Sequence, residues 1–155
     1  MDSLLTLLQQ AEAARDAADV ALQRTLAALQ QARTQQGQLE QYRAEYEARY
    51  AEQFARGASI DIVRCYQGFA QRLVQAIEQQ AQAVRAAEGR VEAAREPLRQ
   101  AELQVASIRK LIERRSEEQR LKEQRREQRQ TDENAARANG RGLSMFGAMP
   151  SLRGA

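Results

Sequence analysis

The chain has 155 residues, a formal net charge of +3 and a sequence pI near 9.4. Glycine is scarce, prolines number two and strand-forming residues are few, so the composition predicts helix nearly throughout and at most one ordinary domain. There is no histidine and a single cysteine, Cys65, which excludes a zinc site, an intrachain disulfide and a histidine-dependent catalytic pair. We therefore expect no enzyme activity, no cofactor and no metal.

Charge and hydropathy narrow the function further. The arginines alternate with glutamates and form no stripe of one sign, so the basic pI does not predict a nucleic-acid partner. The N-terminal run "MDSLLTLLQQ" lacks a basic flank and is too short for a signal peptide or a membrane span. We therefore expect a cytoplasmic protein that does not insert into a membrane, with Cys65 as a reduced thiol.

Residues 3–55 carry the pattern of a first helix. Its seam residues recur at alternating steps of four and three, which are the a and d positions of a heptad repeat. Such a repeat is typical of a coiled coil, in which a narrow seam is buried and no cofactor-sized cavity forms. The first seam consists of Leu4, Leu8, Ala11, Arg15, Ala18, Leu22, Thr25, Leu29, Ala32, Gln36, Leu39, Arg43, Tyr46 and Tyr50.

A turn and a second helix follow. In "RGAS", residues 56–59, Gly57 suits a left-handed helix end and Ser59 can cap the next helix. We expect that helix over 60–137, with a bend or a missing hydrogen bond at Pro97. The second seam consists of Val63, Tyr66, Ala70, Leu73, Ile77, Gln80, Val84, Ala87, Val91, Ala94, Leu98, Ala101, Val105, Ile108 and Ile112.

The two seams match as an antiparallel hairpin in which the numbers of facing residues sum to 116. Large residues then face small ones, as with Leu29 and Ala87, which fills a narrow seam without overpacking. Gln36 would face Gln80, and this amide pair is expected to lock the register. Arg15 and Arg43 also occupy seam positions, and we expect their stems to extend outward to solvent.

The two edges of this hairpin differ in chemistry. The charged edge carries Glu12, Asp19, Arg33, Glu40, Glu47, Glu88, Arg95, Glu102 and Arg109. The apolar edge carries Ala14, Ala21, Ala28, Gln35, Tyr42, Phe69, Ala76 and Ala83. Tyr50 and Tyr66 face each other and are expected to close the end of the coiled coil near the turn. Tyr42 and Phe69 either do the same or form an exposed patch for a partner.

Beyond Ile112 the register leaves no residue of the first helix to pair with. The C-terminal arm, 113–137, keeps helical residues but has Leu121 as its only large apolar side chain. Ion pairs such as Glu117 with Arg120, Glu118 with Lys122 and Glu123 with Arg126 can support a lone helix by about 0.2 to 0.5 kcal/mol each. The arm is either a projecting rod of net positive charge or a frayed, solvated tail.

The domain boundaries follow from these elements. Residues 1–138 form the helical unit, and the glycine-rich stretch 139–155 is expected to be disordered, with a docking motif around Met145 and Phe146 as an alternative. The predicted fold class is thus all-α: a long two-helix antiparallel coiled-coil hairpin with an extended, charged C-terminal helical arm.

Four segments carry a family resemblance: "QLEQYRAEY", "YQGFAQRLVQAIEQQ", "LIERR" and "EQRREQRQTDENAAR". From Met1 to Arg137 the sequence resembles the FliJ family of flagellar export proteins. The resemblance implies a hairpin similar to the central stalk subunit of rotary ATP synthases. It further implies that the ends remote from the turn enter the pore of a hexameric export ATPase, and that the protein escorts export chaperones at the inner membrane of the flagellar base.

The resemblance also implies a patch that binds the cytoplasmic part of the membrane export gate. By position it comprises Gln35, Leu39, Tyr42, Tyr46, Phe69, Leu73, Ala76 and Gln80. Gln80 has two conflicting expectations, because a residue used to lock the seam is poorly placed to touch a partner. On the arm, the side chains expected to meet the ATPase ring are Arg120, Arg125, Arg126 and Arg129.

Three other functions remain open from the sequence. An injectisome stalk of the YscO type would have the same two-helix coiled-coil pattern. A generic structural coiled coil would self-associate through the apolar edge. A nucleic-acid binder would need salt-sensitive binding.

Overall fold

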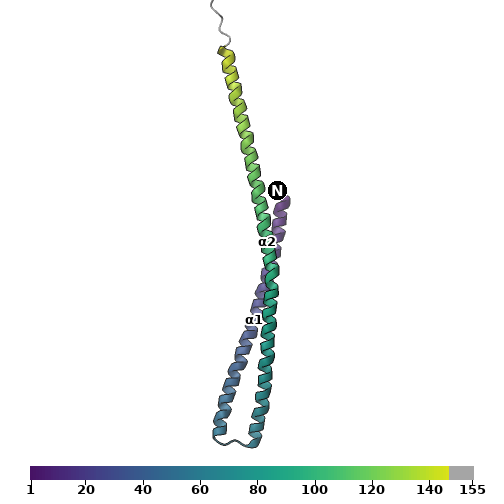
Figure 1. Cartoon of the computed structure of the whole chain (residues 1–155), viewed down its shortest axis with the longest axis vertical. Coiled ribbons are helices and arrows are strands. Elements are labelled where there is room, and N and C mark those ends of the chain that lie inside the picture. The colour runs from purple at the N-terminus through teal and green to yellow at the C-terminus, as the bar shows by residue number, and fades with distance from the viewer. Residues whose placement is uncertain (147–155) are drawn as a thin grey trace, which may run out of the picture. The chain divides into compact units, whose positions relative to one another are not determined.

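The structure, a computed structural model, describes residues 1–146 and contains two helices (Figure 1). Helix α1 spans Asp2–Ala55 and helix α2 spans Ile60–Phe146. The chain divides into two compact units, one of residues 2–106 and the other of Met1 with the chain from Ser107 onward. In the first unit, α1 and the first half of α2 form an antiparallel hairpin. The predicted all-α, two-helix fold is confirmed.

The core of the hairpin is the predicted seam. The buried cluster consists of Leu22, Leu29, Val84, Ala87 and Val91, against which Leu26, Ala32, Ala94 and Leu98 pack. Among all predicted seam residues only Arg43 is exposed; every other one is buried or half-buried. Burying a leucine or valine side chain contributes about 1.5 to 3 kcal/mol relative to leaving it in water. The alternation of large and small residues therefore holds the two helices together.

The turn has the predicted chemistry. Gly57 has a φ of 88°, the left-handed conformation that a side chain disfavours, and its N–H donates to the Phe54 carbonyl at 3.1 Å. The Ser59 hydroxyl accepts from the N–H of Ile62 at 3.4 Å, and the Ser59 carbonyl accepts from the N–H of Val63 at 3.1 Å. Ser59 thus caps α2. Helix α2 then continues through Pro97.

Polar residues in the seam are accommodated in two ways. Arg15 pairs with Asp16 at 3.0 Å and Arg43 with Glu47 at 3.0 Å, so both guanidinium groups reach solvent as expected. The predicted pairing of Gln36 with Gln80 is wrong. The Gln80 amide donates to the Ala32 carbonyl at 2.8 Å and to Oε1 of Gln35 at 3.2 Å. An unmade hydrogen bond in a half-buried seam is costly, and these two acceptors one turn apart satisfy the amide better than one flexible side chain.

The arm is helical in its own right. Every side chain from 113 to 141 is exposed, and Arg120 forms the predicted ion pair with Glu117. The other two expected pairs are absent among the described residues, because surface pairs gain little over solvation.

Helix α2 continues to Phe146, into the stretch expected to be disordered from 139. No proline interrupts residues 139–146, and extending an existing helix costs far less than starting one. Residues 147–155 of that stretch, and the side chains of the alternative motif at Met145 and Phe146, lie outside the described residues.

Candidate partner-binding surfaces

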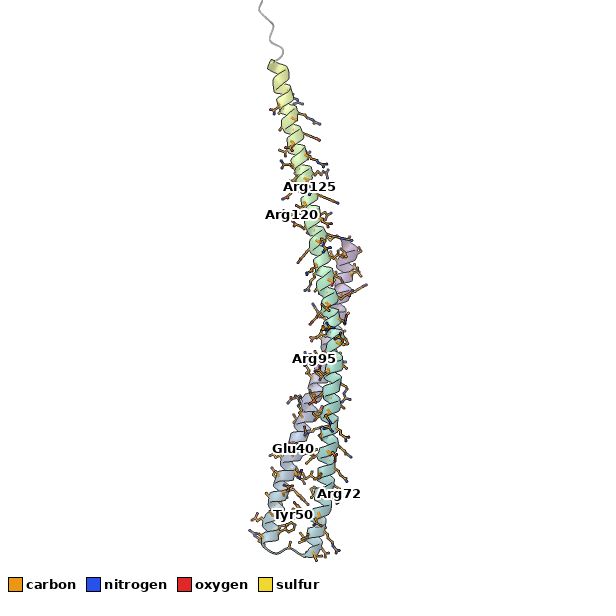
Figure 2. All side chains as sticks on the ribbon, in the orientation of Figure 1. Glu40, Tyr50, Arg72, Arg95, Arg120 and Arg125 are labelled. Atoms are coloured by element: carbon orange, nitrogen blue, oxygen red, sulfur yellow. The ribbon has the colours of Figure 1, made fainter. Side chains whose placement is uncertain are left out.

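The hairpin ends near the turn in a cluster of six aromatic rings. Tyr46 lies at its centre, with ring centroids 4.2 Å from Phe69, 4.6 Å from Tyr50 and 5.6 Å from Tyr66. Tyr50 lies close to the turn (Figure 2), and its ring centroid is 4.6 Å from that of Tyr66, which confirms that the two face each other across the hairpin. Phe54 packs edge-on against Tyr66, with centroids 5.3 Å apart. The six rings therefore form one cluster that spans both helices near the turn.

The aromatic cluster reaches the surface on the apolar edge. Tyr42 is 48 % exposed and its ring meets Phe69 edge-on, with centroids 6.1 Å apart, while Phe69 is half-buried. Tyr42 also stacks on Tyr46 at 6.2 Å. Tyr42 is thus a half-exposed ring that packs against two others, and half-exposed aromatic rings are common anchors of protein interfaces.

Tyr46 is chemically distinct within the cluster. A hydrogen bond with Tyr50 raises the pKa of Tyr46 to about 12, and burial and the neighbouring rings add to the shift. The raised pKa keeps the Tyr46 phenol protonated well above neutral pH. Recognition at this surface should depend on shape and apolar contact.

The structure brings most of the eight predicted gate-binding residues together on the hairpin. Gln35, Leu39, Tyr42 and Gln80 line one shallow hollow on the apolar edge. Gln80 reaches it through its bond to Gln35, which resolves the conflict between its two expected roles. Tyr46 and Phe69 form the ring cluster beside it, and Ala76 is half-buried. Leu73 is only 7 % exposed, so it offers few atoms to a partner and mainly supports the surface from below.

Gln38 is a member of this surface that the sequence reasoning missed. It lines the hollow together with Leu39 and Gln35. Its position three residues after Gln35 puts the two on one helix face, so the spacing alone could have found it.

The arm arginines separate into two groups. Arg125, Arg126 and Arg129 share one face of α2 with Lys122, on which the structure has a shallow surface depression. Arg120 does not line it, and a helical step of nine residues places it opposite Arg129. Its guanidinium binds the Glu117 carboxylate, which raises the pKa of Arg120 and lowers that of Glu117. Of these four arm arginines, only Arg125, Arg126 and Arg129 form no ion pair within the described residues.

On the charged edge, one ion pair joins the two helices across the middle of the hairpin. Arg33 on α1 pairs with Glu88 on α2 at 3.3 Å, and both side chains are about half exposed. A pair of this kind contributes little energy, about 0.2 to 1 kcal/mol, but it penalises other registers. The middle of this edge is therefore a solvated border.

The described residues contain no cluster of side chains suited to a metal ion and no helix apolar and long enough to cross a bilayer. The fold and its surfaces define a two-helix coiled-coil hairpin with an aromatic face near the turn and a basic helical arm.

Comparison with known proteins identifies the family. The family model described as "Flagellar FliJ protein" matches residues 1–144. The chain therefore belongs to the FliJ family, whose members are components of flagellar protein export. Searches of curated proteins and of solved structures found no match.

Proposed function

We propose that this chain is a non-enzymatic stalk of the flagellar export apparatus that links the hexameric export ATPase to the cytoplasmic part of the membrane export gate. It acts in the cytoplasm, peripherally at the inner membrane, and hands on export chaperones. The observation that carries the proposal is the ordered, uncharged aromatic surface around Tyr42 on a hairpin that belongs to the FliJ family.

The gate surface is proposed to be the hollow and ring cluster on the apolar edge. Tyr42 supplies an exposed ring at its centre, and the amides of Gln35, Gln38 and Gln80 border it with neutral hydrogen-bonding groups. None of these groups is charged at neutral pH. Binding to the gate should therefore depend weakly on salt, unlike binding by an electrostatic patch.

The gate surface is tested by replacing Tyr42 and Phe69 with alanine. Aromatic anchors commonly cost about 2 kcal/mol or more on truncation, so the double variant should lose at least about thirtyfold in affinity for the gate domain. Binding is measured by titration calorimetry, and circular dichroism checks that helicity is retained. Leu103→Ala is the control, because Leu103 is 52 % exposed on α2 away from the rings. Unchanged gate affinity in the folded double variant would reject this surface.

The arm is proposed to enter the ATPase ring. Its exposed helix carries the unpaired arginines Arg125, Arg126 and Arg129 on one face, which suits the carboxylates of an acidic pore wall. Residues 116–137 extend a helix by about 33 Å at about 1.5 Å per residue, enough to reach into a pore.

The arm is tested by a stop codon after Arg115 and by a charge reversal of these three arginines. We expect the truncated protein to bind the gate normally and to lose stimulation of the ATPase. The triple reversal should give a milder, salt-sensitive loss. Arg120→Glu is the matched control, because Arg120 lies on the other face and is already neutralised by Glu117. Full stimulation by the truncated protein would leave the arm without this role.

Two measurements on the protein alone complete the test. Sedimentation should show a monomer, whereas a structural coiled coil that pairs through its apolar edge would self-associate. No nucleotide hydrolysis is expected in the absence of the ATPase.

A further inference from the structure

A second hollow lies on the charged edge near the turn, opposite the proposed gate surface. It has a volume of about 630 Å³ and lies between α1 and α2. It forms because the Arg43 side chain, although at a seam position, points outward and pairs with Glu47. Tyr46 leans toward Phe69, and Ala70, which faces Tyr46 in the hairpin register, is too small to fill the space.

The hollow has an apolar floor and a polar rim. Its floor is made by Tyr46, Tyr66, Ala70, Leu73 and Val74. Val74 is 42 % exposed, whereas the same edge carries charged residues farther from the turn. An exposed apolar floor beneath a polar rim is typical of a surface that another protein covers.

The rim carries one uncompensated charge. Arg43 is neutralised by Glu47, while Gln67 and Gln71 are neutral amides. Arg64, on the α2 side, forms no ion pair within the described part of the chain. A partner that fills the hollow therefore gains by bringing a carboxylate to Arg64.

The walls determine what shape of partner fits. Both are α-helices, whose backbone groups are already hydrogen-bonded, so a strand cannot add to them by backbone pairing. The lining extends along α2 from Arg64 to Val74, about 15 Å, which matches roughly three turns of a helix. A third helix laid between two others buries side chains at i, i+3 or i+4, and i+7.

We propose that this hollow is a second docking site, which takes an amphipathic helix of a partner protein with an apolar face and a carboxylate directed at Arg64. The helix completes a local three-helix bundle. Tyr46 and Leu73 lie in the seam beneath both surfaces, but the rim of the hollow lies on the edge opposite Tyr42, so the helix can bind while the gate surface is occupied. The site goes beyond the proposed stalk function and does not depend on it.

The test uses two synthetic stapled helices of about 12 residues, a length that covers the hollow. Both carry leucines at i, i+3 and i+7; one has glutamates and the other lysines beside them. Binding to the full chain is followed by fluorescence anisotropy and mapped by amide chemical shifts. We expect the acidic helix to bind at least about tenfold tighter than the basic one, with shifts centred on Gln67 to Val74.

Two surface variants distinguish specific binding at the hollow from non-specific hydrophobic binding. Val74→Arg should abolish binding of the acidic helix, whereas Val20→Arg, a change at a similarly exposed position on α1, should leave it unchanged. Arg64→Glu should reverse the preference toward the basic helix. Equal binding of the two helices, or full binding to the Val74→Arg variant, would overturn the proposal.

The same variant distinguishes this site from the gate surface. Val74→Arg should keep full affinity for the gate domain, because Val74 lies on the other edge. Loss of gate binding in this variant would mean one continuous site and would also overturn the proposal. Failure of gate binding in the native chain would affect only the proposed stalk function.

Discussion

The middle of the hairpin and its end near the turn use the same heptad positions with different residues. In the middle, Leu29 and Ala87 lie in one buried cluster and are only 7 % and 3 % exposed. Near the turn, the corresponding positions hold Arg43, Tyr46 and Tyr66. There the side chains are half-buried or exposed, and a hollow opens on each edge.

The difference shows how one repeat can provide both stability and recognition. Aliphatic and small residues fill a seam completely, so that region contributes burial and exposes little apolar surface for a partner. Near the turn, Arg43 turns outward from the seam and leaves apolar side chains such as Val74 exposed. The predictions below test this division, from the largest expected effect to the smallest.

Leu29→Ala should have the largest effect on stability. Leu29 is 7 % exposed within the core cluster, and removing a buried leucine side chain costs about 2 to 5 kcal/mol, depending on how well the cavity collapses. Urea unfolding followed by circular dichroism measures the change. Leu103→Ala, at an exposed position, should stay within about 0.5 kcal/mol. Similar losses for both variants would contradict a closed central seam.

Arg43→Leu should make the seam near the turn resemble the filled seam in the middle of the hairpin. A leucine at this seam position can turn inward toward Leu73, and we expect a gain of about 1 kcal/mol in the free energy of unfolding. The surface pair with Glu47 that is lost contributes less than that. The second hollow should fill, and the acidic helix should no longer bind. Arg72→Leu is the control, because Arg72 is exposed and lies outside the seam (Figure 2); an equal gain there would point to a general helix effect.

Alkaline pH should lower the stability of the hairpin near the turn, where Tyr46 lies. Because the folded state raises the pKa of Tyr46 from 10.0 to about 12, the folded chain holds the proton more tightly than the unfolded chain does. The stability contributed by this proton is fully present below pH 10 and is lost as the pH rises toward 12. A titration of the Tyr46 ring by NMR measures the pKa. Tyr50→Phe should lower it toward 10.0, whereas Tyr66→Phe should not, because Tyr66 does not contribute to the shift.

The ion pair on the charged edge should have the smallest effect. A double-mutant cycle of Arg33→Ala and Glu88→Ala should give a coupling of about 0.2 to 1 kcal/mol, because both side chains are about half exposed. The coupling should fall in high salt. A value above 2 kcal/mol would mean that the charged edge stabilises the hairpin as much as the seam does.

Much of the fold could be predicted because a heptad repeat specifies its own buried face. The seam positions, the left-handed Gly57 and the Ser59 cap depend on local spacing and backbone chemistry, which the sequence displays directly. Pairing of Tyr50 with Tyr66 followed from the register. The end of α2 was placed too early, since glycines lower helix propensity without ending a helix that is already formed.

The surfaces were less predictable because they depend on which way long side chains turn. Gln80 could bond to Gln36 or to Gln35 in the same register, and only the geometry selects Gln35. Arg43 was expected to reach solvent, but the hollow that it leaves also needs Tyr46 to lean toward Phe69. The separation of Arg120 from the other arm arginines follows from helical spacing and could have been found.

The short connection at Gly57 has a consequence for how quickly the hairpin assembles. Tyr50 and Tyr66 close only a small loop through this turn, whereas Arg33 and Glu88 are 55 residues apart, and loop-closure entropy rises with length. We expect the chain to fold from the turn outward, with the rings meeting first. Tyr66→Ala should therefore mainly slow folding, while Leu29→Ala should mainly speed unfolding. Stopped-flow kinetics of the two variants would show the reverse pattern if the central seam formed first.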